Sequence, residues 1–306
     1  MKALHVNRFA IYVYWDPQGS LRDYALYFVR ELKKNCSRVV FIANGFLSSQ
    51  AKKTLLEEGI EVHTRKNFGY DFYAYKFGLD ILSPSLQECD ELILSNSSVY
   101  GPFIPFEKIL TKMDDLRLDF WGISSWKGDP WPTHIHSYFL AFRNKILVSE
   151  HFTSYWNNLP PIKNRQEAIE KCEVRLTNFF SNYGYSWCVY TEDSEDGDYS
   201  IMRARKSLAS GMPFLKRKYF ENHNVEYKEK IATVNMIRSL TSYDINMIFS
   251  DYFVTTLQAP KKILNLNPFK IAVKKRFPIL TRIRKRFWSW RKSFFTFIKT
   301  SEFNEK

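Results

Sequence analysis

The amino-acid sequence predicts an α/β fold: a Rossmann-type, mostly parallel sheet followed by a mixed half that is rich in aromatic residues. Between residues 9 and 94, short apolar and β-branched runs alternate with segments whose apolar residues recur every three or four positions. Strands that alternate with helices form βαβ units, in which the strands run parallel. After residue 119, aromatic strand-like runs follow one another without an intervening helix, which indicates antiparallel or mixed pairing.

The parallel half contains four predicted strands and three predicted helices. The strands are short and rich in apolar or β-branched residues, and they are Phe9–Trp15, Arg38–Ala43, Glu61–Thr64 and Glu91–Leu94. The helices have the 3.6-residue period and run from Leu21 to Leu32, from Ser48 to Glu58 and from Tyr70 to Leu82. Turn residues at Asp16–Ser20 and at Asn44–Gly45 separate the first elements.

The mixed half is predicted from two strand-like runs and one helix. Asp119–Ser125 and Tyr138–Arg143 are the strands, and the Trp-, Pro- and His-rich segment Trp126–His136 between them is predicted as a loop. Gln166–Tyr183 has helical periodicity and ends before a glycine. Glu173 falls on the inward side of this helix, which is unusual because burying an unpaired carboxylate is costly.

Polar residues follow all four predicted parallel strands. They are Asp16, then Asn44, then Asn67 with Gly69 and Asp71, and finally Asn96, Ser97 and Ser98. Sheets of this class bind ligands beyond the carboxyl ends of their strands, so the set predicts a binding site. The alternative for each position alone is ordinary turn chemistry, because Asn, Asp, Ser and Gly dominate turns.

The positive charge is confined to the C-terminal end. The chain has a formal net charge of +13, yet residues 261–306 contain 14 Lys or Arg and two acids, so the other 260 residues carry only +1. We therefore predict two parts, a folded domain over 1–258 and a basic tail over 259–306. The near-neutral body argues against a nucleic-acid-binding surface.

The tail is predicted to form basic amphipathic helices. One helical face collects Leu280, Ile283, Phe287, Trp290, Phe294 and Ile298, while Arg and Lys fill the rest. This pattern is typical of an element that lies on an anionic membrane surface, and residues 261–299 are the predicted contact. The alternative is a helix that packs on the body.

Cysteine usage and the N-terminus predict a cytoplasmic location. Cys36, Cys89, Cys172 and Cys188 form no CxxC pair and are expected to be reduced thiols. Met1–Phe9 lacks the apolar stretch of a signal peptide. The acidic run Thr191–Tyr199 does not have the ligand spacing of a calcium loop and is expected to be a surface loop.

Several segments occur in the order seen in one family. Asn67 begins N-x-G-x-D, residues 94–103 read LSNSSVYGPF, and residues 120–123 read FWGI. HIHSYFLAF at 134–142, EVRLT at 173–177, GMPFLK at 211–216 and Tyr243–Ile245 follow. From Phe9 to Phe253 the chain resembles the rhamnan synthesis protein F family. The resemblance implies a GT-A-type glycosyltransferase that works on bacterial cell-surface polysaccharides.

The resemblance also implies roles for individual residues. Glu173 would be the catalytic base of an inverting transfer. The alternative is a purely structural role, as a helix-surface glutamate in a salt bridge. Together with the strand-end pattern, the resemblance gives these expected donor-binding residues: Tyr14, Asp16, Asn44, Arg65, Asn67, Gly69, Asp71, Asn96, Ser97, Ser98 and Lys216. The implied acceptor-binding residues are Trp126, Trp131, His134, Ser137 and Tyr138, although the aromatic ones could equally be core. His134 and His136 could suggest zinc, but no third ligand is suitably spaced.

The chain departs from the family at the metal motif. Such enzymes usually hold Mg²⁺ or Mn²⁺ through Asp, and many relatives have Asp at the place of Ser97. Neutral Asn and Ser side chains bind hard cations weakly compared with carboxylates. Either Asp71 and the diphosphate hold the metal, or Arg65, Lys66 or Lys216 replace it.

The implied function is transfer of a sugar such as rhamnose from a nucleoside-diphosphate donor to a lipid-linked polysaccharide or lipopolysaccharide acceptor. The tail would place the enzyme peripherally on the inner face of the cytoplasmic membrane. Two other classes stay open. One is a catalytically inert glycan-binding or scaffold protein, which the missing Asp suggests. The other is a nucleic-acid-binding protein that acts through the basic tail.

Overall fold

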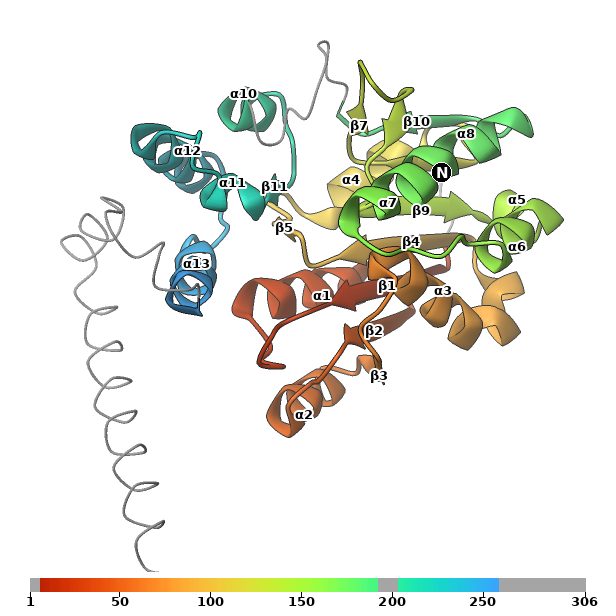
Figure 1. The fold of residues 1–306 in the computed structure, drawn as a ribbon, viewed down its shortest axis with the longest axis horizontal. Coiled ribbons are helices and arrows are strands. Elements are labelled where there is room, and N and C mark those ends of the chain that lie inside the picture. Colours follow the sequence, from red (N-terminus) through yellow and green to blue (C-terminus); the bar gives the residue numbers. More distant parts are fainter. Residues whose placement is uncertain (1–5, 192–202, 259–306) are drawn as a thin grey trace, which may run out of the picture. The chain divides into compact units, whose positions relative to one another are not determined.

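A seven-stranded sheet in the order β10-β6-β9-β4-β1-β2-β3 is the centre of the fold (Figure 1). The computed structural model describes residues 6–191 and 203–258, with side chains as far as residue 252. The parallel half consists of β1 (Arg8–Tyr14), α1 (Asp23–Asn35), β2 (Arg38–Asn44), α2 (Ser49–Glu57), β3 (Glu61–Arg65), α3 (Tyr70–Leu82) and β4 (Glu91–Asn96). All seven elements match the prediction to within a few residues.

Strands β3, β2, β1 and β4 lie side by side in that order and are all parallel. The order 3-2-1-4 is that of a Rossmann-type nucleotide-binding half, so the predicted fold class is confirmed. Alternate residues of β1 face opposite sides of the sheet. Ile11 belongs to the same core cluster as Phe72 and Leu79 of α3, whereas the Tyr12 ring contacts Phe28 of α1 with ring centroids 4.9 Å apart. Helices α1 and α3 therefore cover opposite faces, and the carboxyl ends of the four strands share one edge.

The other half of the sheet is mixed, as predicted. β9 (Phe139–Arg143) is antiparallel to both β4 and β6 (Phe120–Gly122), and β10 (Trp187–Val189) is parallel to β6. The loop prediction for Trp126–His136 is wrong at both ends. Two short strands, β7 (Ser125–Trp126) and β8 (His134–Ile135), pair antiparallel there and make a hairpin. The paired residues are eight and ten positions apart, and strands of only two residues show no periodic pattern in the sequence.

The predicted helix over Gln166–Tyr183 is confirmed, but it is not uniform. It consists of α7 (Arg165–Ala168), a π-helical segment η2 (Ile169–Val174) and α8 (Arg175–Asn182). The side chain of Asn164 caps its start by accepting a hydrogen bond from the Glu167 amide, 3.0 Å away. Single π turns inside α-helices occur frequently at functional sites, and this one carries Glu173.

The remaining elements were not predicted individually. They are η1 (Ser83–Glu88), β5 (Val99–Tyr100), α4 (Phe106–Asp114), α5 (Asn144–Leu147), α6 (Glu150–Asn157), α10 (Ala204–Ala209), β11 (Leu215–Lys216), α11 (Lys218–Glu221), α12 (Tyr227–Leu240) and α13 (Asn246–Gln258). The described residues up to Phe253 belong to one compact unit. The predicted tail over 259–306 and all of the predicted acidic loop except Thr191 lie outside the described residues. Within the described ranges, no helix is long and apolar enough to cross a membrane.

Candidate functional site

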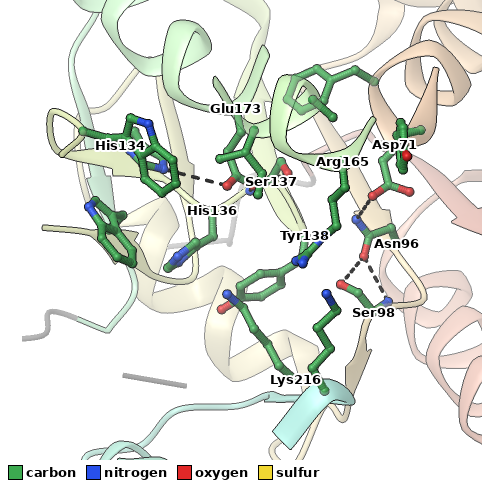
Figure 2. Close-up of a pocket in the computed structure, with 17 residues that line it drawn as sticks. Asp71, Asn96, Ser98, His134, His136, Ser137, Tyr138, Arg165, Glu173 and Lys216 are labelled. Atoms are coloured by element: carbon green, nitrogen blue, oxygen red, sulfur yellow. Dashed lines mark hydrogen bonds and ion pairs between the residues drawn. The ribbon is translucent and has the colours of Figure 1, made fainter. Parts of the chain in front are cut away.

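A pocket of about 280 Å³ lies beyond the carboxyl end of β4, between α3, the β7–β8 hairpin and η2 (Figure 2). Two walls face each other across it. Asp71, Asn96 and Ser98 form one wall, while His134, His136, Ser137 and Glu173 form the other. Tyr138, Arg165, Lys216 and Lys218 also line the space, as do Trp126 and Trp131 of the hairpin. The pocket thus gathers ten of the sequence-predicted site residues.

Glu173 is held firmly as a carboxylate. Its Oε2 accepts a hydrogen bond from the Ser137 amide at 2.7 Å and another from the Ser137 hydroxyl, and its Oε1 lies 3.8 Å from His134 Nε2. Burial by itself would raise the pKa of Glu173, but bonding to His134 and Ser137 and the positive charges of His136 and Lys216 outweigh it. They lower the pKa of Glu173 to about 2, so the carboxylate is ionised at neutral pH.

The two histidines on this wall are oriented by different partners. His134 Nδ1 lies 2.8 Å from the Pro132 carbonyl oxygen and must donate to it, which turns Nε2 toward Glu173. His136 Nδ1 contacts Ser124 Oγ at 3.0 Å, and that hydroxyl contacts the Tyr138 hydroxyl at 2.8 Å. Both imidazoles are buried, line the pocket and contact other polar groups there.

The opposite wall is built around Asn96. Its amide Nδ2 donates to Asp71 Oδ2 at 3.0 Å, and its Oδ1 accepts from both the amide and the hydroxyl of Ser98. Asn96 therefore fixes Asp71 and the turn after β4 at the same time. Burial and the nearby negative charge of Glu173 raise the pKa of Asp71 from its ordinary value of 3.8 to about 6.

The start of α3 explains the glycine of the N-x-G-x-D segment. Gly69 has a φ of 67°, and Tyr70 after it has a φ of 55°. A Cβ on Gly69 would lie 2.5 Å from the Tyr73 ring, so neither the conformation nor the space suits another residue. A positive φ at a bulky aromatic residue is a genuine outlier. It lies at the rim of the pocket, where strained backbone often accompanies function.

The side chains of the pocket do not form a complete divalent-metal site by themselves. Within residues 6–191 and 203–258, no group of three or more His, Cys, Asp or Glu is arranged to hold one. Mg²⁺ and Mn²⁺ prefer oxygen ligands, and Mg²⁺ is usually held by one or two carboxylates together with waters and substrate phosphates. On the Asn96 wall the one carboxylate, Asp71, is bonded to Asn96, and the Asn96 carbonyl oxygen is bonded to Ser98.

Seven predicted donor-binding residues do not line the pocket. Asp16 accepts bonds from the amides of Gln18 and Ser20 and pairs with Arg22, which stabilises the turn after β1. The Tyr14 hydroxyl donates to the carbonyl of Ser20. Asn44, Arg65, Asn67 and Gly69 lie at the ends of β2 and β3, and Arg65 bonds to Asn44. The Ser97 carbonyl accepts bonds from Tyr24 and Arg217. A direct role for these seven stays a prediction.

Seven pocket residues were missing from the predicted site, and three of them, His136, Arg165 and Lys218, have basic side chains. Arg165 and Lys218 had no signal in the sequence, because exposed Lys and Arg are common at helix ends. His136 was considered but not included, although its spacing of two residues from His134 on a strand places both on one face.

Replacing Asp71 with Asn is expected to stabilise the protein at about pH 7.5. Since the pKa of Asp71 is higher in the folded protein than in the unfolded chain, its ionisation disfavours folding. A rise of about two pKa units corresponds to a gain of up to about 3 kcal/mol, fully present above pH 6 and mostly lost by about pH 4. Urea unfolding of wild type and Asp71→Asn at pH 7.5 and at about pH 4 measures this gain in the free energy of unfolding. The exposed Asp80→Asn on the same helix should change little, and an Asp71→Asn protein that is less stable than wild type at pH 7.5 would contradict the assignment.

Comparison with known proteins places the chain in a family. The model of the rhamnan synthesis protein F family matches residues 39–280. The Sinorhizobium fredii protein y4gN, itself uncharacterized, is 27% identical over 178 residues, which make up 58% of this chain and 46% of that protein. The chain therefore spans about half the length of this curated relative.

Solved structures are similar at low identity. A putative glucose-1-phosphate thymidylyltransferase from Bacillus anthracis is 12% identical with a TM-score of 0.41, over 61% of this chain and 87% of that one. A 4-diphosphocytidyl-2C-methyl-D-erythritol synthase from Anaerococcus prevotii is 13% identical with a TM-score of 0.41. That match covers 71% of this chain and 97% of the synthase chain. The family match covers most of the sequence and includes the pocket residues from Asp71 to Lys218. The chain belongs to the rhamnan synthesis protein F family.

Proposed function

We propose that the pocket binds a nucleoside-diphosphate sugar and transfers the sugar, with inversion, to a hydroxyl group of a glycan acceptor. The observation that carries the proposal is the placement of the ionised Glu173 carboxylate opposite Asn96 and Ser98 in one pocket that also contains Lys216. Such a transfer needs a base for the acceptor proton, positive charge for the leaving diphosphate, and both substrates held in line.

Glu173 is the proposed base, although its low pKa makes it a weak one in the empty pocket. The charges of His136 and Lys216 contribute to that low pKa. A bound diphosphate would neutralise them and so raise the pKa of Glu173 toward its ordinary range. The base would then strengthen only when the donor is in place, which limits unproductive proton transfer.

The acceptor is proposed to lie against the β7–β8 hairpin. Trp126 and Trp131 approach edge to face with ring centroids 5.5 Å apart, and Trp131 approaches His134. The half-buried indole rings of the pocket suit stacking on sugar rings, while His134 and Ser137 are placed to contact hydroxyl groups. Family membership favours a growing cell-surface polysaccharide, carried on a lipid, as acceptor and rhamnose as the sugar.

A panel of nucleotide sugars tests the donor. In thermal unfolding of the full chain, one nucleoside-diphosphate sugar should raise the melting temperature, because a ligand at about 100 times its Kd stabilises the folded state by about 2.7 kcal/mol. For a chain of this size, that corresponds to a shift of roughly 4–5 °C. Melting temperatures unchanged by every donor, with and without Mn²⁺, would instead favour the inert glycan-binding or scaffold protein that the missing Asp at Ser97 suggests.

The basic segment 261–299 is proposed to hold the enzyme on the inner face of the cytoplasmic membrane. Its support is the sequence pattern, with aromatic and aliphatic residues on one helical face and Arg or Lys elsewhere. The full chain should co-sediment with vesicles that contain anionic lipid, and a chain ending at residue 260 should not. If both chains bind equally, the membrane contact lies elsewhere.

A further inference from the structure

We propose that Arg165, Lys216 and Lys218 bind the donor diphosphate directly and take the place of a divalent metal ion. This inference rests on the proposed function, since it assigns the charge that the leaving group needs. Three cationic side chains from two separate segments line the same pocket. Figure 2 shows Arg165 and Lys216 reaching into one space from opposite sides, next to Ser98.

The two lysines are placed by the pairing of β11 with β5. Lys216 is the register partner of Val99, and the Arg217 amide donates to the Ser98 carbonyl at 2.9 Å. This segment is therefore attached to the turn that follows β4. Lys216 and Lys218, on either side of Arg217, both line the pocket.

Arg217 anchors the segment from the other side. Its guanidinium bonds to the buried Asp251 at 2.9 Å and 3.2 Å, donates to the Ser97 carbonyl at 3.2 Å, and lies 4.8 Å from the ring centre of Tyr24. A bidentate, desolvated Arg–carboxylate pair is geometrically specific. Because Arg217 is held in this way, its two lysine neighbours are presented to the pocket at fixed positions.

Arg165 completes the cluster from the opposite side. It is the first residue of α7, just after the Asn164 cap, and Asp71 in the pocket lies within its electrostatic influence. The pocket also contains two carboxylates, Asp71 and Glu173, so the three cations give it a net positive charge before the histidines are counted. Both carboxylates already accept hydrogen bonds, from Asn96 and Ser137.

The cluster matches the charge that develops during transfer. The bond between the anomeric carbon and the terminal phosphate oxygen breaks, and its electron pair stays on that oxygen. The acceptor hydroxyl oxygen forms the new bond to the anomeric carbon and gives its proton to Glu173. Ammonium and guanidinium groups stabilise the departing diphosphate through charge-assisted hydrogen bonds, with no metal required.

The experiment is calorimetric titration of the full chain with inorganic pyrophosphate and with UDP, GDP and dTDP, in EDTA and in Mn²⁺. At least one nucleoside diphosphate should bind equally well in both buffers. Lys216→Gln and Arg165→Gln should each weaken its binding about tenfold, and the double variant about 100-fold, since each removes one charged hydrogen-bond donor. Lys216→Arg should keep most of the affinity. Lys163→Gln, an exposed change two residues from Arg165, is the matched control.

The outcomes separate this inference from the proposed function. Binding that requires Mn²⁺ would overturn the metal-free site and leave nucleotide binding intact. Equal affinity of wild type and both Gln variants would overturn the role of the cations. If no nucleoside diphosphate binds in either buffer, the proposed function falls and this inference falls with it.

Discussion

Glu173→Gln is expected to reduce sugar transfer at least about 100-fold, because general-base catalysis typically contributes 10²- to 10⁴-fold. The glutamine carbonyl can still accept the hydrogen bond of the Ser137 amide, so the fold and the pocket should persist. What is lost is the negative charge that would receive the acceptor proton. Initial rates with the donor that the thermal panel identifies measure the effect.

The matched control is Glu170→Gln, one residue of the same π-helical segment that is exposed to solvent. It should transfer sugar at the wild-type rate. Melting temperature and donor affinity of Glu173→Gln should stay close to wild type, which separates a catalytic loss from unfolding. Turnover like that of the wild type would remove Glu173 from the mechanism.

Asp71 provides an internal comparison for the same experiment. Two carboxylates in one pocket have pKa values pushed apart, to about 2 for Glu173 and about 6 for Asp71. Such separation often marks groups with different roles in acid–base chemistry. If Asp71→Asn, and not Glu173→Gln, abolished transfer without loss of donor affinity, the base would be Asp71, and Glu173 would instead orient His134.

The sequence was sufficient for the parallel half of the fold because its signals are local. Helix Tyr70–Leu82 matches the prediction at both ends, because its apolar periodicity begins directly after the glycine of N-x-G. Glu173 stood out for a physical reason too, since a carboxylate on the inward face of a helix requires partners. Ser137 and His134 are those partners.

The parts that could not be predicted depend on contacts between distant residues. No local pattern marks the pairing of Lys216 with Val99, which are 117 positions apart, and both strands have only two residues. The π turn at Glu173 uses residues that fit an ordinary α-helix equally well. Asp16 was predicted to bind the donor because it follows a parallel strand, yet its oxygens are occupied by the turn and by Arg22. The position at the strand end is visible in the sequence, but the partner is not.

Asp251→Ala is expected to destabilise the protein by about 3–5 kcal/mol, because removing one partner of a buried ion pair leaves the other charge uncompensated. The Asp251 side chain is only 2% exposed, and it accepts bonds from both Arg217 and the Tyr100 hydroxyl. Arg217 and the Tyr100 hydroxyl would both lose a partner at once. Urea unfolding monitored by Trp fluorescence measures the change in the free energy of unfolding.

A second Arg–carboxylate pair is the control for that measurement. Arg205 and Glu229 also form two hydrogen bonds, but their side chains are 50% and 38% exposed, so Glu229→Ala should cost less than about 1 kcal/mol. Asp251→Asn keeps the shape of the side chain but not its charge. This variant should fold, and it should lose less free energy of unfolding than Asp251→Ala. Its nucleoside-diphosphate affinity should nevertheless fall, since Arg217 would no longer hold Lys216 and Lys218 in place. If Asp251→Ala and Glu229→Ala cost the same, Arg217 is not anchored by Asp251, and the two lysines are positioned by the β5–β11 pairing alone.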